Sequence, residues 1–185
     1  MRFTIVTILL ISLAQIAGAQ KYITRDGFIS FYSHAPLEDI KADNNQVASV
    51  LDTSTGDIVF QVLTRSFHFV KALMEVHFNN DYMESDKYPK STFTGKITGL
   101  ANVDFTKPGT YNVTVDGDLT IHGVTKSIKV PGSIEVLKDG INATSKFTVV
   151  PEDYNITIPG VIRDHIAKIV EVTVEMKYSP LGKNE

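Results

Sequence analysis

A lysine and a histidine on one short stretch of the chain could bind a polar or anionic ligand group. His122-Gly123 is a turn dipeptide, and Lys126 follows it within a segment that alternates apolar and polar residues. Lys126 shares the apolar phase of Val124 and Ile128, where a charge is costly unless it is paired or reaches water. Lys126 and His122 are therefore candidates for contact with the head group of an amphiphile. The alternative is that Lys126 extends past the barrel end into solvent or lies at a bulge that reverses the phase.

The remaining ionisable residues do not form a catalytic or metal-binding pattern. His77 lies close to Met74 and could ligate a metal or haem, although a core histidine that donates to a backbone carbonyl is the commoner arrangement. Asp116 and Asp118 share the polar face of a strand, where solvated carboxylates are expected. Glycine-rich phosphate loops and the G-x-S-x-G and H-E-x-x-H motifs are absent from the sequence. We expect a binding protein without catalytic residues, metal or cofactor.

Three long segments of alternating residues must position these groups. A period of two indicates strands with one buried and one solvated face. Residues 111–121 alone would extend roughly 37 Å at about 3.4 Å per residue, and strands of that length can enclose a long ligand. We expect the inward side chains of the three segments to line such a lumen: Tyr111, Val113, Val115, Leu119, Ile128, Val130 and Phe147.

Shorter stretches complete the expected sheet. Asp26-Gly27 predicts a turn between two opening strands, and Pro131-Gly132 predicts a bulge or bend because proline cannot donate to a ladder. About eight strands without a βαβ rhythm favour an antiparallel sheet that closes into a barrel and leaves no exposed edge. The segments with strand character, including the opening pair and the short extra row at 154–158, are residues 22–24, 28–33, 47–51, 58–63, 93–97, 111–121, 124–136, 141–149, 154–158 and 170–178.

One segment changes to a helical period. Phe69, Leu73 and Val76 recur at helical spacing, which predicts a helix over about 69–78, followed by a polar loop over 79–90. An apolar helix face needs an apolar surface, and a closed barrel offers one at an end or along its wall. We therefore expect the helix and loop to cover one opening of the barrel. The candidate lid residues, which would contact the ligand, are Tyr82, Met83 and Tyr88.

The first residues and the composition predict an exported protein of one domain. Arg2 is followed by an apolar run and then by Ala17-Gly18-Ala19, the pattern of a cleaved secretory signal peptide. We expect residues 1–19 to be removed and residues 20–185 to form one barrel domain, periplasmic or secreted. The absence of cysteine excludes disulfides and thiolate catalysis, and a net charge of −3 gives no support for a nucleic-acid partner.

Several motifs, taken in order, resemble those of the YceI-like lipid-binding family. The resemblance covers about residues 22–178 and is carried by residues 118–126, by His77-Phe78 through Tyr82-Met83, by Lys87-Tyr88-Pro89 and by Phe93-Thr94-Gly95. It implies an all-β fold, namely an eight-stranded antiparallel, lipocalin-like barrel in an exported bacterial protein. It also implies an apolar lumen that holds a polyisoprenoid chain, such as a quinone or a polyprenyl phosphate.

The expected function is the sequestration or transport of a long isoprenoid or similar amphiphilic lipid. The alternative is a structural or interaction protein without a ligand, whose barrel is packed solid by side chains such as Phe60, Phe93, Phe147 and Tyr111. A weaker alternative is an enzyme that acts on a bound lipid. The sequence leaves open which lipid is bound, whether the lumen is open and what the oligomeric state is.

Overall fold

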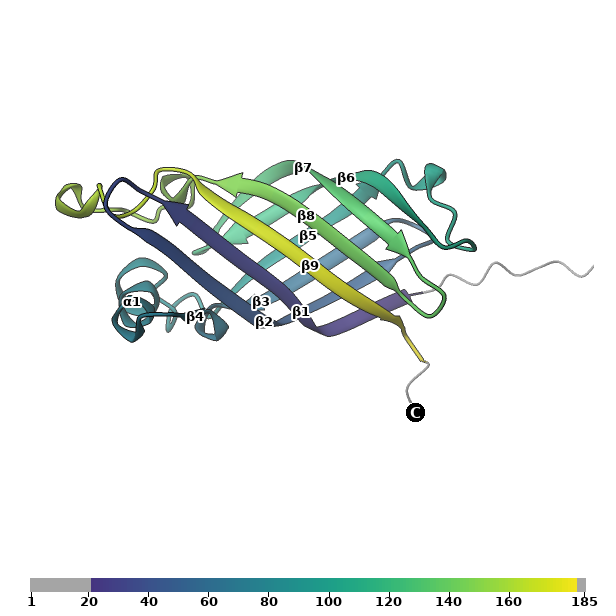
Figure 1. Ribbon diagram of the computed structural model, residues 1–185, viewed down its shortest axis with the longest axis horizontal. Coiled ribbons are helices and arrows are strands. Elements are labelled where there is room, and N and C mark those ends of the chain that lie inside the picture. Colours follow the sequence, from purple (N-terminus) through teal and green to yellow (C-terminus); the bar gives the residue numbers. More distant parts are fainter. Residues whose placement is uncertain (1–20, 183–185) are drawn as a thin grey trace, which may run out of the picture.

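Eight long antiparallel strands close into a barrel, as expected (Figure 1). The computed structural model describes residues 21–182, and the expected signal peptide lies outside the described residues. The barrel order is β1-β9-β8-β7-β6-β5-β3-β2, and β2 pairs back with β1, while the two-residue β4 adds to β2. The strands are β1 (Lys21–His34), β2 (Asp39–Asp52), β3 (Asp57–Leu63), β4 (His68–Phe69), β5 (Lys90–Thr98), β6 (Gly109–Ile121), β7 (Val124–Val136), β8 (Ile141–Val149) and β9 (Val170–Pro180).

Short helices occupy the connections between the strands. Within residues 21–182, no helix has the length and apolar character needed to cross a membrane. We call the barrel end that carries residues 35–38, 64–89, 122–123 and 150–169 the helical end, and the opposite end the packed end. The helices are the 3₁₀ helix η1 (Thr64–Ser66), α1 (Ala72–His77), the π-helix η2 (Phe78–Tyr82), and the 3₁₀ helices η3 (Leu100–Asn102), η4 (Pro151–Tyr154) and η5 (Gly160–Ile162).

β1 is one continuous strand, so the hairpin expected at Asp26-Gly27 is wrong. The pairing of β1 with β2 shifts register between Thr24 and Gly27 and again between Gly27 and Ile29. Such shifts are the sign of a bulge, which bends a strand and increases its twist. Gly27 lies so close to Met176 that a Cβ would stand 2.3 Å from the methionine sulfur. The glycine therefore allows close packing against Met176 at a bend, and the chain does not reverse there.

The barrel wall separates between β7 and β8. β7 pairs with β6 in unbroken register over its whole length, so the bulge expected at Pro131-Gly132 is absent from that ladder. β8 pairs with β7 only over Gly132 to Val136. Pro131 lacks the N–H group that would continue this second ladder. The first half of β7, residues 124–131, is described in full and is not paired with β8, which lets the barrel widen toward its helical end.

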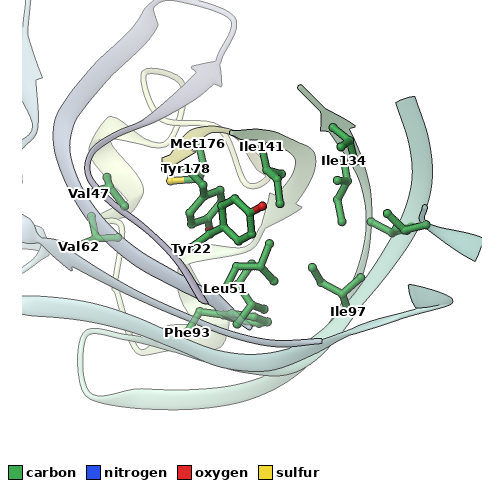
Figure 2. Close-up of a cluster of buried hydrophobic side chains, with 14 residues drawn as sticks. Tyr22, Val47, Leu51, Val62, Phe93, Ile97, Ile134, Ile141, Met176 and Tyr178 are labelled. Atoms are coloured by element: carbon green, nitrogen blue, oxygen red, sulfur yellow. The ribbon is translucent and has the colours of Figure 1, made fainter. Parts of the chain in front are cut away.

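Aliphatic and aromatic side chains from opposite walls fill the packed end (Figure 2). Leu51, Ile134 and Met176 are each at most 1 % exposed. The hydroxyl of Tyr178 lies 2.6 Å from Oγ of Ser49 within this cluster. Burial raises the pKa of Tyr178, so the phenol stays neutral at physiological pH and keeps its hydrogen bond. This end of the barrel is a closed core.

Two glycines allow β5 and β6 to approach beneath the ring of Phe93, and this packing gives a testable expectation. A Cβ on Gly117 would lie 2.4 Å from the Cα of Gly95 and 2.8 Å from Cζ of Phe93. We expect Gly117→Ala to lower the free energy of unfolding by about 1–3 kcal/mol, measured by urea denaturation, because backbone atoms cannot move aside easily. Gly160→Ala is the control, since no atom lies within 4 Å of its Cβ position. Equal stabilities of the two variants would contradict this packing.

A buried segment that follows β8 packs across part of the helical end. Residues 154–158 were expected to form a strand, and that expectation is wrong, because only Tyr154 belongs to a regular element, η4. Tyr154, Ile156 and Ile158 are nevertheless buried, and together with Met83 they form a second apolar cluster. The cluster packs against side chains at the ends of β6, β7 and β8. The alternating pattern therefore indicated burial correctly, although the segment makes no ladder.

α1 covers this end of the barrel, as expected, but it turns its predicted apolar face to solvent. Leu73 and Val76 are exposed, whereas Met74 and Phe78 line the barrel interior. The helix is only six residues long and contains no buried residue. A helical period identifies such a segment as a helix, but it does not decide which of two apolar faces is buried.

Candidate functional site

An apolar cavity of about 540 Å³ occupies the barrel between the packed end and the helical end. Ile97 and Ile134 belong to the packed core and line its inner part. His77 and His165 line it at the helical end and are accessible to solvent, so the cavity reaches the surface there. Its volume lies within the range of about 300–1,000 Å³ that is typical of small-molecule sites.

Most of the expected lumen residues line this cavity. The strands that carry them pair in the register that alternation requires, for example Val115 opposite both Ile97 and Val130. Tyr111 does not line the cavity: its ring packs against the core of the packed end, and its hydroxyl donates to the carbonyl of Asp104 at 3.3 Å. The expected residues that do line the cavity are Val113, Val115, Leu119, Ile128, Val130 and Phe147.

A cluster of four phenylalanines covers the cavity beneath α1 and η2. The centroid of the Phe78 ring, on η2, lies 5.5 Å from the ring centroid of Phe31, 5.7 Å from that of Phe67 and 5.1 Å from that of Phe69. All four rings line the cavity. Phe69 was expected on the helix, and no role was expected for Phe31 or Phe67. The alternation in Phe67-His68-Phe69 is the signal that could have identified the short strand β4.

Two of the three candidate lid residues line the cavity. Tyr82, at the end of η2, and Met83, which follows it, are both in the lining. Tyr88 is not in the lining, because its ring packs against the imidazole of His122 at 4.4 Å and against Gly123. The structure thus places Tyr82 and Met83 where a ligand could touch them, and places Tyr88 against the turn between β6 and β7.

His122 is held in a network that ties three connections of the helical end together. It is nearly buried, its Nε2 lies 2.9 Å from Glu84 Oε2, and its Nδ1 lies 3.2 Å from the carbonyl oxygen of Tyr154. The carboxylate and the carbonyl both act as acceptors, and the imidazole ring supplies the donor. His122 is not in the cavity lining, and its contacts cross-link the connections around the β6–β7 turn.

Lys126 is not brought to the cavity. It pairs opposite Leu119, which does line the cavity, so its position on the apolar phase was read correctly. Its side chain is nevertheless exposed and absent from the lining. Lys126 lies in the half of β7 that is not paired with β8, where nothing forces an inward side chain to stay inside. The solvent-facing alternative matches this placement.

The polar groups at the cavity rim come from loops between strands, and nothing in the sequence indicated that these loops contact a ligand. Glu38, between β1 and β2, lines the cavity and accepts a hydrogen bond from Nζ of Lys71 at 2.5 Å. Its second carboxylate oxygen lies 3.5 Å from Nδ1 of His165. The hydrogen bond from Lys71 holds the pKa of Glu38 below its usual range, and His165 adds to this effect. Glu38 therefore joins three segments around the mouth of the cavity.

This arrangement predicts a looser rim in acid. A lowered carboxyl pKa means that the contact stabilises the folded state at neutral pH and is lost as pH falls through that pKa. We expect hydrogen-exchange protection of the segments around Glu38 and Lys71 to fall about two- to fivefold as pH drops below the ordinary glutamate pKa of about 4.3, as for other solvent-accessible ion pairs. Glu38→Gln should show the lower protection already at pH 7. An identical acid response in the two proteins would assign the effect to other carboxylates, such as Asp39 beside His34.

Within the described residues, no group of three or more histidine, cysteine, aspartate or glutamate side chains is arranged to hold a metal ion. The site consists of an apolar chamber, an aromatic cover and a few polar groups at one mouth. Such a site is suited to a ligand with a long apolar body.

The fold and the cavity together define a closed antiparallel β-barrel with an apolar interior. The domain model of the YceI-like family matches residues 23–178, and the chain belongs to this family. The resemblance in the motifs is thereby confirmed. Comparison with curated proteins gives no match.

Solved structures share the fold at low sequence identity. A polyisoprenoid-binding domain from Saccharophagus degradans, implicated in plant cell wall breakdown, is 16% identical with a TM-score of 0.75, over 88% of this chain and 98% of that one. BcnA from Burkholderia cenocepacia is 16% identical with a TM-score of 0.68, over 83% and 96%. A YceI protein from Campylobacter jejuni is 14% identical with a TM-score of 0.51, over 99% of each chain. At these identities the likeness establishes the fold.

Proposed function

We propose that this protein binds a long isoprenoid chain or a similar amphiphilic lipid inside its barrel. The observation that carries the proposal is the apolar cavity of about 540 Å³, which is closed by the packed end and reaches the surface at the helical end. Membership of the YceI-like family supports the ligand class, as does the fold shared with a domain described as polyisoprenoid-binding.

Affinity would come from burial of the chain. Each CH₂ group removed from water contributes about 0.8 kcal/mol, so ten buried carbons contribute roughly 8 kcal/mol before the cost of ordering the ligand. The cavity wall offers branched aliphatic side chains and phenylalanine rings, which suit a methyl-branched chain without directional bonds. Selection would then depend on the length and width of the cavity.

The polar rim gives the ligand an orientation. Glu38, His77 and His165 line the cavity only at the helical end, so the apolar tail would point toward Ile97 and Ile134, with the head group at the mouth. A hydroxyl could donate to the carboxylate of Glu38, and a carbonyl or phosphate oxygen could accept from a histidine or from Lys71. In this proposal the head group contacts the rim groups, and Lys126, whose side chain is exposed and outside the cavity lining, takes no part.

The cavity favours a ligand-binding barrel over a solid one. Phe60, Phe93 and Phe147 are large enough to fill a barrel, yet all three line the open volume instead of closing it. We also propose that the protein acts by binding and not by catalysis, and that it is exported by the leader at residues 1–19. N-terminal sequencing of the native protein tests the export proposal, with a start at Gln20 or Lys21 as the expected result.

A chain-length series tests the binding proposal. The protein is stripped of lipid and titrated with farnesol, geranylgeraniol and solanesol, and unbranched alcohols of equal carbon number serve as the control series. We expect saturable binding whose affinity rises at least about tenfold with each added isoprene unit until the cavity is full. Absence of saturable binding by the whole series would contradict the proposal.

A further inference from the structure

Large apolar side chains stand exposed around the mouth of the cavity. Scattered single residues of this kind are ordinary on protein surfaces, but their concentration at one end is not. In the rest of residues 21–182, Leu181 is the one large apolar residue that is at least half exposed. The residues at the mouth are Leu37 (66 % exposed), Val70 (98 %), Leu73 (66 %), Val76 (50 %), Val161 (93 %) and Ile169 (59 %).

These residues belong to three connections that together form the rim. Leu37 lies between β1 and β2, and its backbone N–H donates to the carbonyl of Asp164, just beyond η5, at 3.0 Å. Glu38 joins the same connection to Lys71, which precedes α1. Figure 1 shows the β1–β2 turn and α1 at the same end of the barrel. Each connection also contributes residues to the cavity lining, so the exposed side chains surround an opening.

The charges at this end offer no attraction to anionic lipids, because acidic residues outnumber lysine and arginine on these connections. Contact with a lipid surface therefore has to come from the apolar tips. Glu38 is paired with Lys71, and three further carboxylates at this end lie beside histidine nitrogens. The pairs are His34–Asp39 (2.6 Å), Lys71–Glu38 (2.5 Å), His68–Glu75 (3.6 Å) and His77–Asp81 (2.6 Å).

We propose that the helical end docks on the surface of a phospholipid bilayer and inserts these aliphatic tips, so that the cavity mouth faces the lipid. The inference rests on the proposed function, because a cavity for a membrane-derived chain needs access to the membrane. α1 supports it, since it is apolar on its inner face through Met74 and on its outer face through Leu73 and Val76. Apolar side chains that a helix turns outward can enter the boundary between head groups and acyl chains, and membrane affinity increases with the apolar area that is buried there.

A bilayer fits this surface better than a second protein does. A stable protein interface needs a contiguous, closely packed patch of about 800 Å² on each partner. Here the apolar residues are separate tips on three connections, with charged residues such as Lys71 and Lys168 exposed between them. A fluid interface can accommodate separate tips, whereas a rigid partner must match their spacing.

Vesicle flotation tests the proposal. The purified protein is mixed with vesicles of phosphatidylethanolamine and phosphatidylglycerol, and with vesicles of phosphatidylcholine alone. We expect both to carry the protein upward, in low and in high salt, because the contact is apolar. Leu73→Ser and Val161→Ser should each reduce the membrane-bound fraction by about tenfold, as expected for loss of a buried aliphatic side chain. Leu137→Ser, an exposed leucine at the packed end, is the matched control and should bind as the parent protein does.

The outcomes separate this proposal from the binding function on which it rests. Both mouth variants should still bind solubilised isoprenoid alcohol with unchanged affinity, because neither side chain lines the cavity. Absence of flotation, or flotation that disappears in high salt and is unaffected by the mouth variants, would overturn docking by insertion. So would a concentration-dependent dimer in sedimentation velocity that Leu73→Ser abolishes, because the apolar end would then contact a second copy.

Discussion

Val115→Trp is expected to reduce isoprenoid affinity by about a thousandfold while leaving the barrel folded. Val115 lies opposite Ile97 and Val130 and faces the cavity. An indole at this position would occupy space that the ligand chain needs, and displacement of about five carbons corresponds to roughly 4 kcal/mol, or about three decades of affinity. Titration with geranylgeraniol measures the loss. The chain contains no other tryptophan, so indole fluorescence would also report what surrounds position 115.

Asp116→Trp is the matched control, because Asp116 neighbours Val115 on β6 but is exposed on the opposite face. It should change neither affinity nor stability by a measurable amount. The unfolding free energy of Val115→Trp distinguishes an open chamber from a solid one. In a solid barrel the indole would overpack the core at a cost of about 1–3 kcal/mol. Unchanged lipid binding together with such a loss of stability would contradict the cavity assignment.

Phe78→Ala is expected to release bound lipid at least about tenfold faster. Phe78 contacts the other three rings of the phenylalanine cluster and anchors η2 over the cavity. Truncation of a well-packed phenylalanine costs about 3–5 kcal/mol when the residue is fully buried, and somewhat less is expected for this half-buried ring. The loss should be local, since Phe78 lies on η2 and is not part of a strand ladder. Stopped-flow exchange with excess vesicles measures the release rate.

Asn80→Ala provides the control on the same helix, because Asn80 is exposed on η2. Hydrogen exchange adds a second readout, as Phe78→Ala should lower protection over residues 72–85 and leave the packed end unchanged. Release at the parental rate, despite a loosened η2, would mean that the lipid leaves by another route. The first candidate for that route would be the wall beside residues 124–131 of β7, which do not pair with β8.

The barrel was predictable from sequence because alternation is a local signal that determines which face of a strand is buried. The same signal correctly placed Val113, Val115 and Phe147 at the cavity, where strand register carries each inward side chain to a common interior. Tyr111 has the same phase but lies near the packed end, beside the connection that supplies its hydrogen-bond acceptor at Asp104. Phase identifies the inner face, and only the three-dimensional structure shows how far along the barrel the open volume extends.

The rim of the site could not be predicted in this way. Glu38, Lys71 and His165 come from three connections far apart in the sequence and meet through loop geometry, for which no periodic signal exists. For Lys126, the predicted position on the inward phase of β7 is correct, but the side chain is exposed. It lies where β8 separates from β7, so the inward phase does not bury it. The buried face of α1 was predicted wrongly because both faces of the helix are apolar, and the helical period does not show which of them packs on the barrel.

Mass spectrometry of solvent extracts from the native protein is the most direct test of the central claim. The protein is purified from its own source without detergent and compared with Val115→Trp prepared identically. The account predicts about one isoprenoid chain per molecule of parent protein, and little or none in the variant. The proposal would be contradicted if the extract held no isoprenoid or other long-chain lipid and the purified protein also bound no isoprenoid on titration.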